Sequence, residues 1–151
     1  MTSLASYQPL PVEQSPAAVD LLDPDPSRAR HVISSFLEDS PLDELAGQDL
    51  VGAVSEVVTN AQLHGRPPVR VRAWMADDEV VVTVLDQGEG PDSDEELGVR
   101  PVARGPGEGG LGLWLAGQLC DELALGQTPS GFAVRLRSRP GRGGARRADV
   151  R

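Results

Sequence analysis

The sequence predicts an α/β (α+β) fold, a two-layer sandwich in which a mixed, mostly antiparallel sheet is covered on one face by about three helices. The order of the expected elements supports this fold, because helix, helix, strand, strand, loop, helix, strand, strand supplies one sheet and one helical layer. The 151 residues suit a single domain, and 39% of them are hydrophobic, which is enough for a packed interior.

Hydrophobic periodicity and turn residues place these elements along the chain. The helical segments repeat apolar residues at three- and four-residue intervals, whereas the strands are short apolar runs between turns. The expected elements are an edge strand at 17–22, helices from 25 to just before 41 and from 42 or 48 to 64, strands at 69–75 and 79–85, a helix from 109 or 110 through LGLWLAGQLCDEL, and strands at 122–126 and 132–137.

The same reading divides the chain into three regions. Residues 1–17 contain three prolines and no clear period, so we expect a flexible leader. Residues 18–138 form the folded domain. Residues 139–151 are rich in arginine and glycine, which predicts a disordered tail.

Composition narrows the functional classes. A net charge of −9 disfavours a nucleic-acid partner held by general electrostatics, although the arginine-rich end at 135–151 leaves such contact as a weaker alternative. Cys120 is the only cysteine, which excludes an intrachain disulfide and favours the reducing cytoplasm. No apolar run is long enough to predict a membrane-spanning helix.

The segment AVSEVVTNAQLHG places Glu56, Asn60 and His64 at four-residue intervals, so a helix aligns them beside an apolar stripe. The amide oxygen of Asn60 can ligate magnesium, which takes oxygen ligands together with substrate phosphates. Glu56, one turn earlier, can orient or deprotonate a hydroxyl or water that attacks a terminal phosphate. An ordinary solvated helix face shows the same pattern, so this line of residues is not decisive alone.

A second motif, VVVTVLDQGEGP, ends an apolar strand in Asp86 and continues with Gly88 and Gly90. A carboxylate at a strand end can accept a hydrogen bond from an exocyclic amine, and the two glycines let the backbone approach a flat ring. A simple turn after a strand is the alternative explanation.

A third motif, GPGEGGLGLWLAGQL, has glycines at 105, 107, 109, 110 and 112 before and inside a helix start. Free N–H groups at a helix N-terminus bind phosphate, and the helix dipole assists them. The motif is neither a Walker A loop nor a dinucleotide fingerprint, because no Gly-Lys-Ser/Thr follows and no strand directly precedes it. A flexible hinge remains the alternative.

The joint order of the three motifs resembles the histidine-kinase-like (GHKL) ATPases. SEVVTN is similar to their N box, DQGEG to their G1 box and GEGGLGLWL to their G2 box, and the resemblance covers about residues 27–138. The small stand-alone domain and SEVVTNAQLHG are most similar to the anti-sigma-factor serine/threonine kinases. The resemblance implies the GHKL (Bergerat) fold and an ATP-binding domain at 18–138.

The resemblance also implies roles for individual residues. Asn60 would ligate magnesium, and Glu56 would be the catalytic residue that assists phosphoryl transfer. Asp86 would bind the adenine amine, with Gly88 and Gly90 shaping the ring pocket.

The phosphates of ATP would be held by the glycine-rich helix start. Gly110 and Gly112 would contact them, with Gly107, Gly109 and Leu111 in the same cofactor-binding set. Residues 91–107 would form the lid over ATP.

Such kinases phosphorylate a serine or threonine of an anti-anti-sigma protein and keep a sigma factor from RNA polymerase. By resemblance, this chain would bind both partners, use ATP and Mg²⁺, and form a homodimer. Arg30 matches the position of a partner-binding arginine on the first helix, although a solvent-facing arginine would occupy the same place.

Two departures from the family pattern support an alternative function. The first glycine of the family's glycine-rich box is replaced by Glu108, whose charge would repel a triphosphate unless it points away. The family's Gly-Thr-Thr on the last strand is replaced by Gly131-Phe132-Ala133. The alternative is a non-catalytic interaction module, gated by nucleotide or independent of it.

Overall fold

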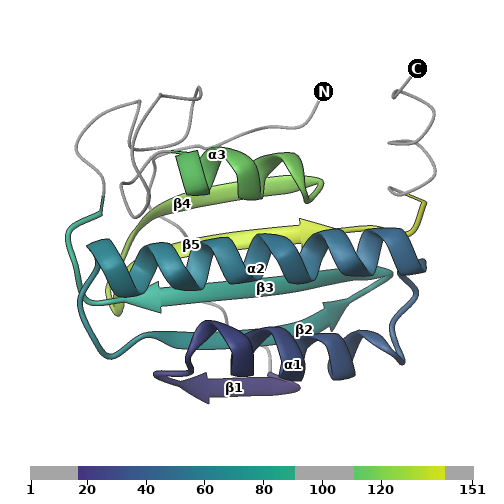
Figure 1. The fold of residues 1–151 in the computed structure, drawn as a ribbon, viewed down its shortest axis with the longest axis horizontal. Coiled ribbons are helices and arrows are strands. Elements are labelled where there is room, and N and C mark those ends of the chain that lie inside the picture. The colour runs from purple at the N-terminus through teal and green to yellow at the C-terminus, as the bar shows by residue number, and fades with distance from the viewer. Residues whose placement is uncertain (1–16, 91–110, 142–151) are drawn as a thin grey trace.

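The computed structural model describes residues 17–90 and 111–141, which form one five-stranded sheet and a layer of helices (Figure 1). The strands lie in the order β1-β2-β3-β5-β4. The elements are β1 (Val19–Leu22), α1 (Pro26–Leu37), α2 (Glu44–His64), β2 (Arg70–Ala76), β3 (Glu79–Asp86), α3 (Leu111–Gln118), β4 (Glu122–Thr128) and β5 (Gly131–Ser138).

Figure 1 shows the three helices on the same face of the sheet, which confirms the predicted two-layer α/β fold. Helix α1 contacts β1, α2 packs on β3 and β5, and α3 contacts β4. Every described strand pair is antiparallel, so the sheet is antiparallel rather than mixed.

Aspartates begin the first two helices, since each accepts a backbone N–H that the first helical turn leaves without a partner. Asp25 Oδ1 accepts the N–H of Arg28 at 2.7 Å, so Asp25 is the N-cap of α1. Asp43 Oδ1 accepts the N–H of Ala46 at 2.7 Å and starts α2 between the two positions that the sequence left open.

Helix α3 is shorter than the sequence predicts. The expected helix ran through Leu123, whereas α3 ends at Gln118. The N–H of Asp121 donates to the carbonyl oxygen of Arg137 at 2.9 Å, so the chain already pairs with β5 there. Apolar residues continue from the helix into β4, and periodicity alone could not separate the two elements.

The core lies between the sheet and the helices. The stripe of α2 that faces the sheet is fully or almost fully buried and contains Leu50, Ala53, Val54, Val57 and Val58. Alternate residues of the central strands face this stripe, including Val82, Val84, Val134 and Leu136. Because aromatic residues make up 3% of the chain, aliphatic side chains supply most of this packing.

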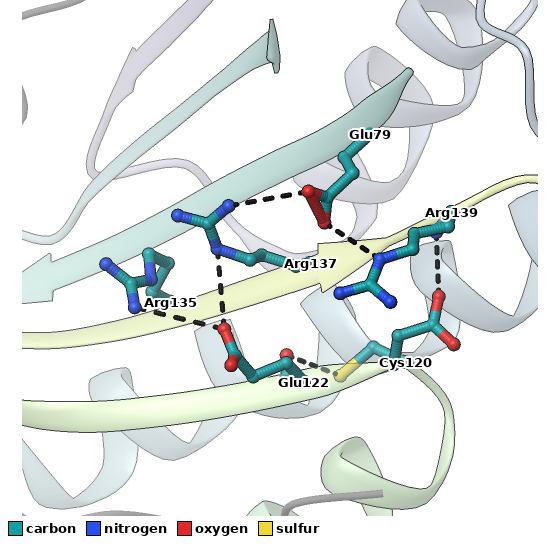
Figure 2. A network of polar contacts seen from close by, with 7 residues as sticks. Glu79, Cys120, Glu122, Arg135, Arg137 and Arg139 are labelled. Carbon is teal, nitrogen blue, oxygen red and sulfur yellow. Dashed lines mark hydrogen bonds and ion pairs between the residues drawn. The ribbon is translucent and has the colours of Figure 1, made fainter. Parts of the chain in front are cut away.

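Charged side chains lie near the end of β5 on the face of the sheet that points away from the helices (Figure 2). Arg137 Nη1 lies 3.7 Å from Glu79 Oε2, and Arg137 Nε lies 3.4 Å from Glu122 Oε1. Arg135 approaches Glu122 at 3.9 Å, and Arg139 approaches Glu79 at 3.2 Å. These arginines therefore form cross-strand ion pairs, which reduces the positive charge that they offer to a nucleic acid.

The described helices include none that is both long and apolar enough to cross a lipid bilayer. The predicted leader, apart from Ala17, and the tail after Gly141 lie outside the described residues.

The α2 stripe generates a stability prediction. Leu50→Ala should lower the free energy of unfolding by about 2–5 kcal/mol, because it removes buried methyl groups and leaves a cavity. Leu22→Ala is the matched control, since Leu22 is 65% exposed and should change the same quantity little. Urea denaturation of both variants measures the difference, and equal effects would contradict the assigned core.

Candidate functional site

Glu56, Asn60 and Gly112 come together where α2 faces the start of α3. A β-carbon built on Gly112 would lie 3.6 Å from Glu56 Oε1 and 3.9 Å from Asn60 Oδ1. Both α2 side chains are partly exposed, so their oxygens are accessible to a ligand. The polar line that helix periodicity predicted on α2 therefore lies against Gly112 of the third motif.

Asp86 ends β3 and is 5% exposed, which is unusual for an aspartate. Its Oδ1 accepts the N–H of Gly88 at 2.6 Å and the N–H of Arg66 at 3.4 Å. Within the described part of the chain, Oδ2 makes no hydrogen bond. Burial raises the pKa of Asp86 above its ordinary value of 3.8, and the two backbone hydrogen bonds oppose this rise.

Glycine residues enclose the Asp86 carboxylate. A β-carbon on Gly65 would lie 2.4 Å from Asp86 Cγ, and one on Gly88 would lie 2.9 Å from Asp86 Oδ1. Gly65 caps α2 with a φ of −93°, which any residue can adopt. The sequence explained Gly65 as a helix stop, but the structure indicates that close approach to Asp86 is the reason for glycine here.

Gly90 and Phe132 form a second close contact beside Asp86. Gly90 has a φ of +82°, and a β-carbon there would lie 2.5 Å from two atoms of the Phe132 ring. Phe132 is also the register partner of Asp86 across the β3–β5 pair. The aromatic ring that departs from the family pattern therefore borders the region expected to form the ring pocket.

Helix α2 connects the two parts of the site. Glu56 and Asn60 lie on its second half, and Gly65, which contacts Asp86, caps its end. At 1.5 Å of rise per residue, Glu56 and Gly65 are separated by about 13 Å along the helix axis. An elongated ligand could thus contact the Asp86 end and the Glu56–Asn60 end together.

Arg30 lies on α1 next to the same part of α2. Its Nη1 donates a hydrogen bond to Ser55 Oγ at 2.9 Å, and Ser55 directly precedes Glu56. The arginine is exposed, so its remaining N–H groups face solvent. This contact brings the predicted partner-binding residue close to the predicted catalytic residue.

Part of the predicted site lies outside the described residues. This applies to Gly107, Gly109 and Gly110, to Glu108, and to the lid at 91–107. Leu111 is the first residue of α3, and its backbone alone is described.

Gly65, the backbone of Arg66 and Phe132 were not among the predicted site residues. The contact between Gly65 and Asp86 joins residues 21 positions apart, so no local pattern reveals it. The only sequence feature that could have indicated Gly65 as a site residue is its position directly after the polar line of α2. For Phe132, the signal was its replacement of a hydroxyl-bearing family position.

Residues 22–138 match the histidine kinase-like ATPase domain. The chain belongs to this family. The match includes the three described helices, the whole of β2, β3, β4 and β5, and the last residue of β1. The two-layer fold and the three motifs therefore lie within one family domain.

Proteins similar to this chain carry two kinds of name. The anti-sigma F factor of Caldanaerobacter subterraneus subsp. tengcongensis is 32% identical, over 77% of this chain and 86% of the relative. The anti-sigma F factor of a Thermoanaerobacter species is 31% identical, over 73% and 82%. The serine-protein kinase RsbW of Bacillus velezensis is 37% identical, over 59% of this chain and 62% of the relative.

The glycine contact generates a binding prediction. Gly65→Ala should weaken the affinity for ATP, because the added methyl group must displace the Asp86 carboxylate. Gly47→Ala on the same helix is the control, since the nearest atom to its new β-carbon is Leu37 Cδ1 at 3.8 Å. Calorimetric titration with ATP and Mg²⁺ measures both, and equal affinities would contradict the role of the contact.

The raised pKa of Asp86 generates a pH prediction. The native state binds this proton more tightly than the unfolded state, so stability falls as pH rises from about 3.8 through the raised value. Asp86→Asn should therefore unfold at higher urea than wild type at neutral pH. The gain should shrink as pH falls through that window, and a less stable variant at neutral pH would refute the argument.

Proposed function

We propose that the chain is an ATP-binding regulator of the anti-sigma-factor type, which phosphorylates a serine or threonine of an anti-anti-sigma protein and sequesters a sigma factor. The names of its relatives support this function, since they include anti-sigma F factors and serine-protein kinases. Membership of the histidine kinase-like ATPase family supports the binding of ATP.

The arrangement of one helix carries the proposal. Glu56 and Asn60 face Gly112 along α2, and the end of the same helix contacts the buried Asp86. This arrangement offers a phosphate end and a base end in one site, as a nucleoside triphosphate requires.

At the phosphate end, Asn60 is the proposed magnesium ligand. Its Oδ1 is a hard oxygen donor, and Gly112 leaves the space beside it free of a side chain. When bound, Mg²⁺ would neutralise charge on the phosphates.

Glu56 is the proposed catalytic residue. Its carboxylate would accept the proton of the acceptor hydroxyl while that oxygen bonds to the γ-phosphorus. The bond from the γ-phosphorus to the bridging oxygen breaks, and ADP leaves with the electron pair. Arg30 and Ser55 lie on the side of Glu56 toward α1, where an acceptor protein could dock.

At the base end, Asp86 is the proposed partner of the adenine amine. Its Oδ2 makes no hydrogen bond to a described residue, although the side chain is almost fully buried. This oxygen can therefore accept a hydrogen bond, and an exocyclic amine would supply the donor. The Asp86 carboxylate lies against Gly88 and the Phe132 ring lies against Gly90, so these groups would border the adenine ring.

The second candidate is a non-catalytic interaction module. Phe132 favours it, because a phenyl ring stands where the family commonly has a hydroxyl that supports the adenine site. In this alternative the protein binds its partner without nucleotide, or nucleotide only gates the interaction.

Phosphoryl transfer tests the proposed function. Purified protein, labelled ATP, Mg²⁺ and the cognate anti-anti-sigma protein should give a labelled partner. Glu56→Ala should abolish the transfer while largely sparing ATP affinity, because Glu56 acts on the acceptor hydroxyl. Asp78→Ala removes an exposed carboxylate outside the site and should leave the rate unchanged.

The controls separate the two candidates. ATP binding without transfer by wild type would reject the kinase and leave a nucleotide-gated module. Absence of binding at about 1 mM ATP, corresponding to about −4 kcal/mol, would favour the nucleotide-free module.

A further inference from the structure

A groove lies between the end of α1 and the start of α2, away from the nucleotide site proposed above. Its volume is about 490 Å³. The described residues that line it, called the acidic groove here, are Ser34, Leu37, Glu38, Leu42, Asp43, Glu44, Gly47, Gln48 and Val51. They combine an apolar floor with three carboxylates, and no basic residue is among them.

Electrostatics at this groove favours a cation. Glu38 and Glu44 are exposed at its rim, whereas Asp43 is engaged in capping α2. Helix α1 ends here at Leu37, and its last turn contains no basic residue. The start of α2 borders the same groove, so its positive dipole end offsets the negative end of α1, and the carboxylates alone supply the negative charge.

The chain itself carries a segment whose positive charge is complementary to the acidic groove. Residues 142–151, called the tail here, contain four arginines and one aspartate, whereas the whole protein has a net charge of −9. Arginine binds carboxylates through two parallel hydrogen bonds, and its aliphatic stem can cover an apolar floor.

The tail also follows β5 at the end of the domain where the acidic groove lies. Figure 1 shows β5 ending on the side where α1 ends and α2 begins. Ten residues extend to about 33 Å at about 3.3 Å each, which is comparable to the length of α2. Covalent attachment gives a high effective concentration, so weak individual contacts suffice for docking.

We propose that the tail docks in the acidic groove of the same molecule. The groove adjoins the Arg30–Ser55 contact, since Ser34 lies one turn after Arg30 on α1 and Val51 lies one turn before Ser55 on α2. A docked tail therefore covers part of the α1–α2 surface beside Arg30. A protein that needs this surface has to displace the tail.

A spin label on the full chain tests the docking. Val150→Cys provides the attachment site, because Cys120, the only native cysteine, is fully buried. At low ionic strength the label should remove most of the amide NMR signal of Gly47, Gln48 and Val51. The signals of Gly126 and Thr128, on β4, should persist. Salt at about 1 M shortens the Debye length to about 3 Å and should restore the groove signals.

Charge variants identify the groove as the docking site. Glu38→Gln combined with Glu44→Gln should abolish the signal loss at Gly47, Gln48 and Val51. The matched control, Asp78→Asn combined with Glu89→Gln, removes two exposed carboxylates outside the groove and should retain it. Circular dichroism confirms that each variant is folded.

Three outcomes would overturn the proposal. One is signal loss that spreads evenly over the surface, and another is loss that persists in the Glu38→Gln, Glu44→Gln variant. The third is loss transferred to an unlabelled chain mixed with spin-labelled chains, which would assign the groove to a second copy. None of these measurements uses ATP, so their outcome is independent of the proposed kinase function.

Discussion

Four small apolar residues of α2, namely Val54, Val57, Val58 and Ala61, hold the helix against the central strands, and the candidate site takes its geometry from that contact. Glu56 and Asn60 flank this buried stripe, so the packing leaves them partly exposed and directs them toward Gly112 of α3. The same packing brings the helix end to β3, where Gly65 meets Asp86. The rise of α2 sets the separation of the two ends of the site, and this hydrophobic contact holds both ends in place against the sheet.

The sequence predicted the fold and the alignment of Glu56 with Asn60 because both follow from periodic patterns within single elements. The stripe of α2, the strand order along the chain and the polar line of Glu56 and Asn60 all depend on spacing within single elements. The structure confirms the elements, with α3 ending earlier because β4 begins to pair with β5. The roles assigned to the site residues stay predictions.

Contacts between distant segments could not be predicted in the same way. Gly65 and Asp86 approach each other only because α2 and β3 pack together, and Phe132 reaches Gly90 only through the β3–β5 register. In both cases a glycine is present because a neighbouring segment occupies the space of its side chain. A single sequence shows the glycine, but it does not show which neighbour requires it.

The buried Asp86 shows a conflict between stability and binding. Its ionised form loses hydration, and backbone N–H groups compensate on one oxygen only. An apolar residue at this strand end would pack without that cost. Retaining a carboxylate at such a position is typical of sites that need the acceptor for a ligand, where stability is lower than the fold alone could reach.

Helix α2 also limits how the acidic groove could affect the nucleotide site. The groove uses its first turns, Ser55 contacts Arg30 in the middle, and Gly65 reaches Asp86 at its end. A rigid helix transmits a ligand's effect only if it has a second arrangement, and the tight packing of Val54 and Val57 leaves little room for one. Tail docking would therefore act by covering surface and charge next to Arg30, rather than by moving Glu56.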